Sequence, residues 1–341
     1  MKQFGIAAGL GVMVAIAPPV AAQHSHDHGK AVVGTVAFAN SCAPDVQADL
    51  LRGIAMVHSF WYSAGEQTFR QVLARDPGCG IAAWGIATVL MDNPLAGVGT
   101  LARNVERAQA AVAEARRAGV RTERERDYIE AAAAYYDNWA GTTESARQQA
   151  RSRAYEALAA KYPDDDEAKI FSALYIAGTQ SQADQTYAAY ARAAGILERQ
   201  LAKHPEHPGV AHYLIHAFDA PPIAAQGLAA ARRYASLAPD SPHALHMPSH
   251  IFTRVGAWED SAAANERAAT VALKSGDVTD AYHASDYLVY AFLQLGRDQA
   301  ARAVMDRIFE HKSDQPPFPL VFAATAMPLT ARCWISVSRA Q

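Results

Sequence analysis

The chain has 341 residues, of which 50% are hydrophobic and 19% are charged, so it can bury a core and is not intrinsically disordered. Its 31 basic and 34 acidic side chains give a formal net charge of -3, without the basic surplus that is typical of nucleic-acid-binding domains. We therefore expect no nucleic-acid partner. The 13 histidines are unevenly distributed and are the main indication of function.

The first 22 residues have the pattern of a secretory signal peptide. Lys2 supplies a basic start, residues 4–17 are uncharged and mostly apolar, and small residues lead to Ala22. Because a membrane span needs about 20 apolar residues, a retained membrane anchor is the less favoured alternative. We expect cleavage near Ala22 and a mature protein that is secreted or periplasmic and does not span the membrane.

The predicted mature chain begins with a histidine-rich segment, residues 23–44, which we expect to be flexible. His24, His26 and His28 lie close together in it. Tracts of this kind bind transition metals weakly through imidazole nitrogens. A polar tail without any ligand is the alternative.

The rest of the chain has the pattern of an all-α fold. From Asp45 onward, apolar residues recur at i, i+3, i+4 and i+7, the spacing of an amphipathic helix, and sustained strand-like alternation is missing. Similar segments end in proline, which stops a helix. These prolines are Pro77, Pro163, Pro205 and Pro239. Since the last two are 34 residues apart, the pattern indicates a repeated helix pair.

This pattern resembles the tetratricopeptide repeat (TPR) family, whose unit is a 34-residue antiparallel helix pair. The unit at residues 46–79 matches the family at Gly53, Gly65, Phe69, Val72 and Pro77. The resemblance implies a right-handed superhelix over residues 45–317, in which the first helix of each pair lines a concave groove that takes a protein or peptide partner. Residues 318–341 are expected to begin one more helical segment, an incomplete repeat.

A disulfide is expected at the first helix pair. Cys42 precedes its first helix and Cys79 follows its second, and an antiparallel hairpin brings these two points together. An exported chain enters an oxidising compartment in which such a bridge forms. Cys333 would then be left over, and three buried thiols are the alternative.

Two pairs of histidines recur in the register of the repeat. His212 and His246 are 34 residues apart, and so are His216 and His250. Within each pair, a spacing of four residues places both rings on one face of a helix. In the TPR frame these are positions that line the groove, so the resemblance implies that four imidazoles project into it.

The same frame extends the set of groove residues. The expected ligand groove consists of His212, His216, Asp219, His243, His246, His250, Arg254, His283, Asp286 and Tyr290. The histidines, the two aspartates and Tyr290 in this set are ligands for a zinc, copper or iron ion, whereas Arg254 is a candidate contact for an anion. The predicted metal ligands are His212, His216, His246 and His250. A polar groove that binds a peptide or acidic ligand without metal, and histidines that only pack, are the alternatives.

Pro248 lies inside the predicted helix that carries His246 and His250. A proline there either kinks the helix or begins a new one. The match to residues 208–241 favours a kinked helix. A helix beginning at Pro248 would instead leave His243 and His246 on a loop.

The sequence contains no GxSxG, P-loop, HExxH, dinucleotide-binding or CxxC motif. An enzyme is therefore the less favoured interpretation. The first hypothesis is an exported scaffold that binds a peptide, a protein or a small ligand in a histidine-rich groove. The second is a transition-metal-binding protein or metal-dependent enzyme that uses the same cluster, with Asp219 or Asp286 as general base.

Overall fold

The computed structural model describes residues 31–311, 323 and 326–327, which contain helices and no strand. The expected all-α fold is confirmed. The predicted signal peptide, the three histidines of the tail and Cys333 lie outside the described residues, and so does nearly all of the segment 318–341.

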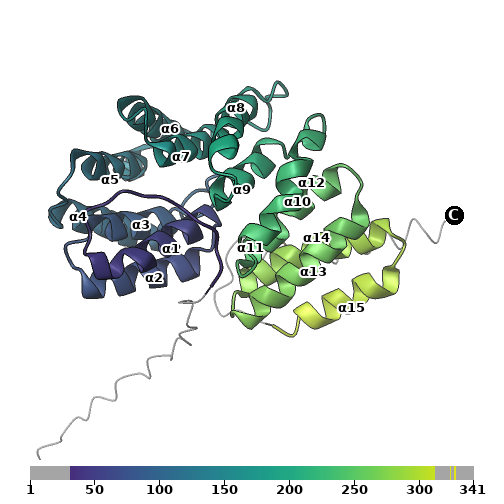
Figure 1. The fold of residues 1–341 in the computed structure, drawn as a ribbon. Coiled ribbons are helices and arrows are strands. Elements are labelled where there is room, and N and C mark those ends of the chain that lie inside the picture. Colours follow the sequence, from purple (N-terminus) through teal and green to yellow (C-terminus); the bar gives the residue numbers. More distant parts are fainter. Residues whose placement is uncertain (1–30, 312–322, 324–325, 328–341) are drawn as a thin grey trace, which may run out of the picture.

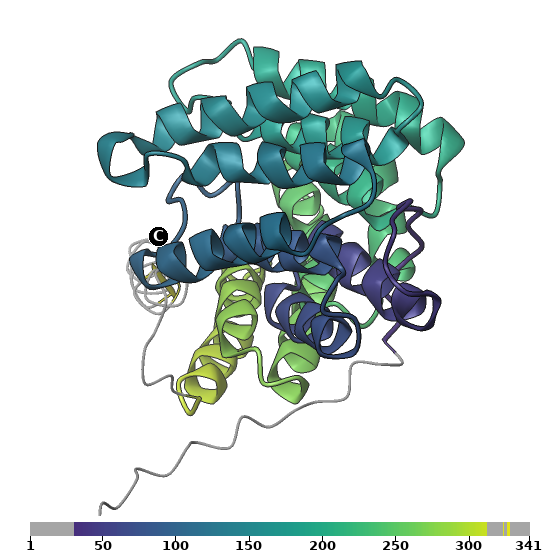
Figure 2. The same ribbon diagram turned by 90° about the vertical axis from the view of Figure 1, so that its left-hand side faces the viewer.

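Seven antiparallel helix pairs follow one another along the described part of the chain (Figures 1 and 2). They are α1 (Gln47–His58) with α2 (Tyr62–Arg75), α3 (Gly80–Leu90) with α4 (Ala102–Arg117), α5 (Glu123–Tyr136) with α6 (Glu144–Lys161), α7 (Asp166–Ala177) with α8 (Ala188–Lys203), α9 (Pro208–Ala217) with α10 (Leu228–Leu237), α11 (Pro242–His246) and α12 (Pro248–Arg254) with α13 (Trp258–Lys274), and α14 (Val278–Gln294) with α15 (Asp298–Ile308). Short 3-10 helices lie at Pro44–Val46, Trp139–Gly141 and Ala224–Gly227.

The repeat pattern of the sequence has a packing reason. Phe69 on α2 is fully buried between α1 and α3. A Cβ atom on Gly53 would lie 2.7 Å from its ring, and one on Gly85 would lie 2.5 Å from it, closer than real contacts allow. Glycine is therefore required on both neighbouring helices, which lets the large aromatic ring join three helices into one core.

Prolines mark the helix starts in register. Pro208 and Pro242 each occupy the first turn of a helix, α9 and α11, where a backbone N–H would have no intrahelical partner. Pro248 begins α12 directly after α11, and Met247 between them keeps helical angles, φ -54° and ψ -36°. The two segments are thus one kinked helix, and His243 and His246 lie on it rather than on a loop.

The row of helix pairs curves so that the first helix pair contacts the fifth. Helix α1 contacts α9, and one apolar core runs from Val33 to Phe252 (Figure 1). The turn after α1 places Phe60 against the rings of His212 and His243. The open concave groove that the resemblance implied is therefore filled at this place by the protein's own first repeat.

The described part of the predicted flexible segment is packed. Residues 31–43 run extended over the helices, with Val33, Val36 and Phe38 buried. The ring of Phe38 stacks on Trp84 at 5.5 Å, and the Arg124 guanidinium lies 4.4 Å from its centroid. The expectation of flexibility up to residue 44 is wrong from residue 31 onward, because the apolar side chains there find a core to pack against.

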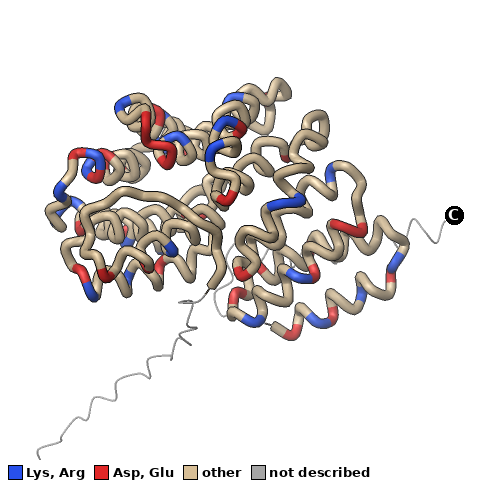
Figure 3. Tube along the Cα trace, in the orientation of Figure 1, with Lys and Arg blue, Asp and Glu red and all other residues tan. Residues whose placement is uncertain are grey.

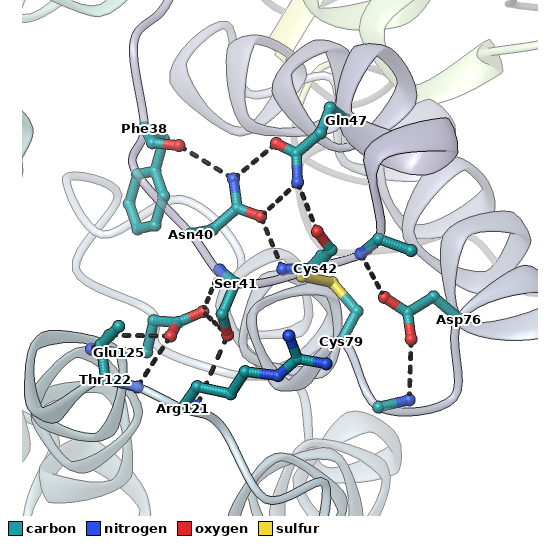
Figure 4. Close-up of a disulfide and its surroundings, with 12 residues drawn as sticks. Phe38, Asn40, Ser41, Cys42, Gln47, Asp76, Cys79, Arg121, Thr122 and Glu125 are labelled. Carbon is teal, nitrogen blue, oxygen red and sulfur yellow. Dashed lines mark hydrogen bonds between the residues drawn. A yellow bond between two sulfur atoms is a disulfide. The ribbon is translucent and has the colours of Figure 1, made fainter.

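Cys42 and Cys79 are joined by a disulfide with a Cα–Cα separation of 4.8 Å (Figure 4). It links the residues before the first repeat to the N-cap of α3. Asp76 lies in the same turn, and its Oδ2 accepts a hydrogen bond from the Ala43 N–H at 2.7 Å. Both connections hold the ends of the first helix pair together.

Acidic and basic residues are interspersed along the helices (Figure 3). Among the described residues, no helix combines the length and the apolar character needed to cross a membrane.

Removing the disulfide is expected to destabilise the protein. The two cysteines are 37 residues apart, and the chain-entropy model gives about 4 kcal/mol for closing such a loop. The Cys42→Ser/Cys79→Ser double variant should therefore unfold at a lower urea concentration than the oxidised protein. A reducing agent should shift the midpoint of the wild type but not that of the double variant. Equal midpoints for both oxidised proteins would contradict the prediction.

Candidate metal centre

Six histidines meet where the first helices of the last three pairs converge. They lie on α9, on the kinked helix α11–α12 and on α14, and they form two groups. We call His212, His216 and His243 the first triad, and His246, His250 and His283 the second triad. Within each triad the ligating nitrogens lie within 4.8 Å of one another.

The first triad combines an i,i+4 pair on α9 with a residue of the next pair. His212 Nε2 and His216 Nε2 are 3.1 Å apart. The Nδ1–H of His212 donates to the carbonyl oxygen of His58 at the end of α1, at 2.7 Å. His243 Nε2 is buried without a hydrogen-bond partner. The first triad therefore presents one buried nitrogen atom, His243 Nε2, that the protein itself does not satisfy.

The second triad is built in the same way across the kink. His246 Nε2 and His250 Nε2 are 2.9 Å apart. His246 Nδ1 bonds Asn265 Oδ1 at 2.6 Å, and His250 Nδ1 bonds Asp219 Oδ2 at 2.7 Å. The ring of His283 on α14 lies 4.4 Å from that of His246.

The Nδ1 partners determine which nitrogen of the second triad carries a lone pair. Asn265 donates its amide to the Ser261 carbonyl oxygen, so its own oxygen accepts, and the Asp219 carboxylate also accepts. Both His246 and His250 must then carry their proton on Nδ1. In the neutral rings, two Nε2 lone pairs face each other at 2.9 Å. That contact is repulsive unless a proton or a metal cation lies between them.

The geometry suits a metal ion. Two nitrogen ligands at about 2.0–2.1 Å from a tetrahedral ion lie about 3.3 Å apart, close to the 3.1 and 2.9 Å observed. Hydrogen bonds from Nδ1 to a carbonyl or carboxylate are the usual support of ligating histidines. The four predicted ligands do not surround one point, however. Each pair is completed by a third histidine, His243 or His283.

Burial favours the neutral form of most of these histidines. His212 is fully buried, and burial lowers its pKa to about 3. Burial, reinforced by the neighbouring histidines, also lowers the pKa of His216, His243 and His246 well below the usual value. Neutral imidazole is the form that binds metals. An additional proton on His246 Nε2 is therefore disfavoured, so it is a poor explanation of the short contact between His246 Nε2 and His250 Nε2.

The remaining predicted groove residues have other surroundings. Arg254 Nε donates to Asp219 Oδ1 at 2.8 Å. Burial raises the pKa of Asp286, one turn along α14 from His283, to about 6. Tyr290 is exposed and packs edge-on against Trp258. The tyrosine that contacts the second triad is Tyr287, whose ring stacks on His250 at 4.9 Å.

The sequence interpretation included Asp219, which orients His250, but missed the groups that orient His246 and His212. Asn265 lies on a second helix of a pair, α13, outside the groove positions, and is fully buried. The His58 carbonyl is a main-chain atom that no motif marks. The side chain of His58 belongs to a separate buried group. In this group, His58 Nε2 and His207 Nε2 lie 2.9 and 3.0 Å from the Glu167 carboxylate. For Asn265, the sequence feature that could have indicated its role was a polar residue within an alanine-rich helix.

A cavity of about 720 Å³ lies away from both triads. It opens between the N-terminal extended segment and the turns that precede α7 and α9, and it is lined by both basic and acidic side chains, including Arg124, Lys203, Asp166 and Glu206. Because its charges are mixed, it indicates no class of ligand.

No protein-family model matches the sequence, and a comparison with curated proteins finds no relative. Among solved structures, a thermophilic TPR protein of Thermus thermophilus is similar at 14% identity and a TM-score of 0.39, over 55% of this chain and 91% of that one. The TPR domain of P58(IPK) is similar at 12% identity and a TM-score of 0.24, over 87% of this chain and all of that one. The chemistry of the site therefore has to follow from its own geometry.

Metal-free protein is expected to lose stability as the pH falls from 7 to 4. The folded-state pKa of His212 is about 3, below the value of 6.5 for a solvent-exposed histidine, so the unfolded chain binds the proton first. The free energy of unfolding then drops by at most about 1.4 kcal/mol per pH unit for each such residue. Urea unfolding at a series of pH values measures this slope, and a flat profile between about pH 6.5 and 4 would contradict it.

Proposed function

We propose that this protein is an exported helical-repeat protein that binds transition-metal ions through its two histidine triads. The observation that carries the proposal is the second triad, where two Nε2 atoms face each other at 2.9 Å while the Nδ1 atoms of both rings bond to oxygen acceptors. A cation between them turns this repulsive contact into two coordinate bonds. All-imidazole sites suit zinc, copper, iron and nickel ions.

The enclosure of the cluster favours an ion over a peptide. His212, His243 and His246 are at most 7% exposed, and Phe60 packs on the first triad. A peptide that lies along the inner helices would have to displace the first repeat, whose core is continuous with that of α9. A small ion needs no such displacement. The histidines that the repeat pattern places on this face are therefore better suited to a metal than to a polypeptide partner.

The second triad has the greater access to solvent. His250 and His283 are partly exposed, whereas every member of the first triad is buried. Asp219 orients His250 and is itself held by Arg254. Burial alone would raise the pKa of Asp219, but the hydrogen bonds that it accepts from His250 and Arg254 lower it, so it stays a carboxylate acceptor. An ion would accordingly enter from the side of α12 and α14.

Export belongs to the same proposal. The signal-peptide pattern of residues 1–22 and the pairing of Cys42 with Cys79 support a secreted or periplasmic location. N-terminal sequencing of the protein recovered from outside the cytoplasm tests it, with cleavage near Ala22 as the expected result.

The purified mature protein, stripped with a chelator and reloaded with Zn²⁺, is expected to bind two ions per chain by elemental analysis. His216→Ala removes one ligand from the first triad and His250→Ala one from the second, so each variant should retain one tight ion and the double variant none. His204→Ala is the matched control, since that ring pairs with Asp166 outside both triads. Zinc content near zero in the folded wild type would overturn the proposal.

Asn265→Ala is expected to weaken Zn²⁺ binding at the second triad about 10–100-fold, because His246 loses the acceptor that orients its ring. Asn265→Asp keeps an oxygen acceptor and should restore most of the affinity. A competition titration with a chromophoric chelator measures both constants. Unfolding curves verify that each variant is folded, and equal affinities for wild type and Asn265→Ala would argue against this role.

A further inference from the structure

The two triads are immediate neighbours. The rings of His216 and His250, which belong to different triads, are 5.9 Å apart, and those of His243 and His246 are 6.0 Å apart. Within the triads, the ring-centroid distances range from 4.4 Å for His246 and His283 to 6.4 Å for His216 and His243. Ions held by the two triads would therefore lie side by side, as the metals of a two-metal site do.

The ligand set restricts the charge that this place can hold. Neither triad contains a carboxylate, so the ligand atoms are imidazole nitrogens that bring no negative charge. Asp219 is the carboxylate that bonds a triad histidine, and Arg254 already offsets its charge. Two divalent ions bring four positive charges into this buried region and two Cu(I) ions half as many, so the Cu(I) pair has the smaller desolvation cost. Imidazole nitrogens are also suitable ligands for copper ions.

The surroundings restrict what can react there. Phe60 covers the first triad, with its ring 4.4 Å from His212 and 5.8 Å from His216. Tyr287 covers part of the second triad. Three ligands leave a copper ion with a free coordination position. A small uncharged molecule fits an enclosure of this kind, whereas a peptide or a charged metabolite would lose its hydration without compensation.

We propose that the two triads form one dicopper centre that binds dioxygen between its ions. In this step, which rests on the proposed metal-binding function, each Cu(I) gives one electron. The O–O double bond becomes the single bond of a peroxide dianion, which bridges two Cu(II) ions, and no proton is taken up. Dioxygen is the oxidant and the copper pair is the reductant. The arrangement of three imidazoles on each side of an enclosed pair of ions is what assigns this reaction.

The experiment uses the metal-free mature protein loaded anaerobically with Cu(I). Two copper ions per chain are expected, and admission of air should consume one dioxygen per two coppers. The oxidised protein should give almost no electron paramagnetic resonance signal, because the two Cu(II) spins couple through the bridge. A ligand-to-metal charge-transfer absorption band should appear when oxygen is admitted and disappear when oxygen is removed.

His243→Ala removes a ligand from the first triad, and His283→Ala removes one from the second. These variants distinguish a dicopper centre from two independent copper sites. Each variant should hold one tight copper, form no oxygen adduct and, after chemical oxidation, show the full signal of isolated Cu(II). His204→Ala should behave as the wild type. Two coppers with the full signal of two isolated Cu(II) ions would overturn the dicopper centre and leave metal binding intact. Failure of the folded wild type to bind copper or zinc would overturn both proposals.

Discussion

The contact between α1 and α9 is the constraint on which the site depends. Without it, the inner face of the repeat would be an open groove, and His212 would lack the main-chain oxygen that orients it. This single interface supplies a cover in Phe60, an acceptor in the His58 carbonyl and a continuous core that extends from the first helix pair into the sixth. A local repeat pattern thus produces a closed arrangement through one contact between residues 154 positions apart.

Much of the fold could be predicted because its rules are local. Proline spacing, helical periodicity and the small residues beside Phe69 each act within one repeat or between neighbours, where sequence patterns are informative. Closure could not be predicted, since it depends on the curvature accumulated over several degenerate pairs. The packing of residues 31–43 was missed for the same reason: Val33 and Phe38 look like part of a tail until the helices that receive them are placed.

The sequence predicted which histidines come together better than it predicted how they divide into two triads. The 34-residue register places His212, His216, His246 and His250 on one face, and the structure brings all four to the same region. Their division into two triads follows from helix positions across the pairs, which set His243 beside α9 and His283 beside α11. Register counting on α14 favoured Tyr290, yet the ring in contact is Tyr287, one turn earlier on the same helix. Main-chain acceptors such as the His58 carbonyl leave no sequence signal.

The disulfide has a consequence for where the cluster can be enclosed. The helix pair that it closes is the same pair whose first turn, after α1, covers the first triad. In a reducing compartment, that pair would lack its covalent closure and open more often, whereas the disulfide keeps its two ends together. The redox state of the compartment would then set how accessible the histidines are, so that one oxidation event couples the protein's location to the state of its interior.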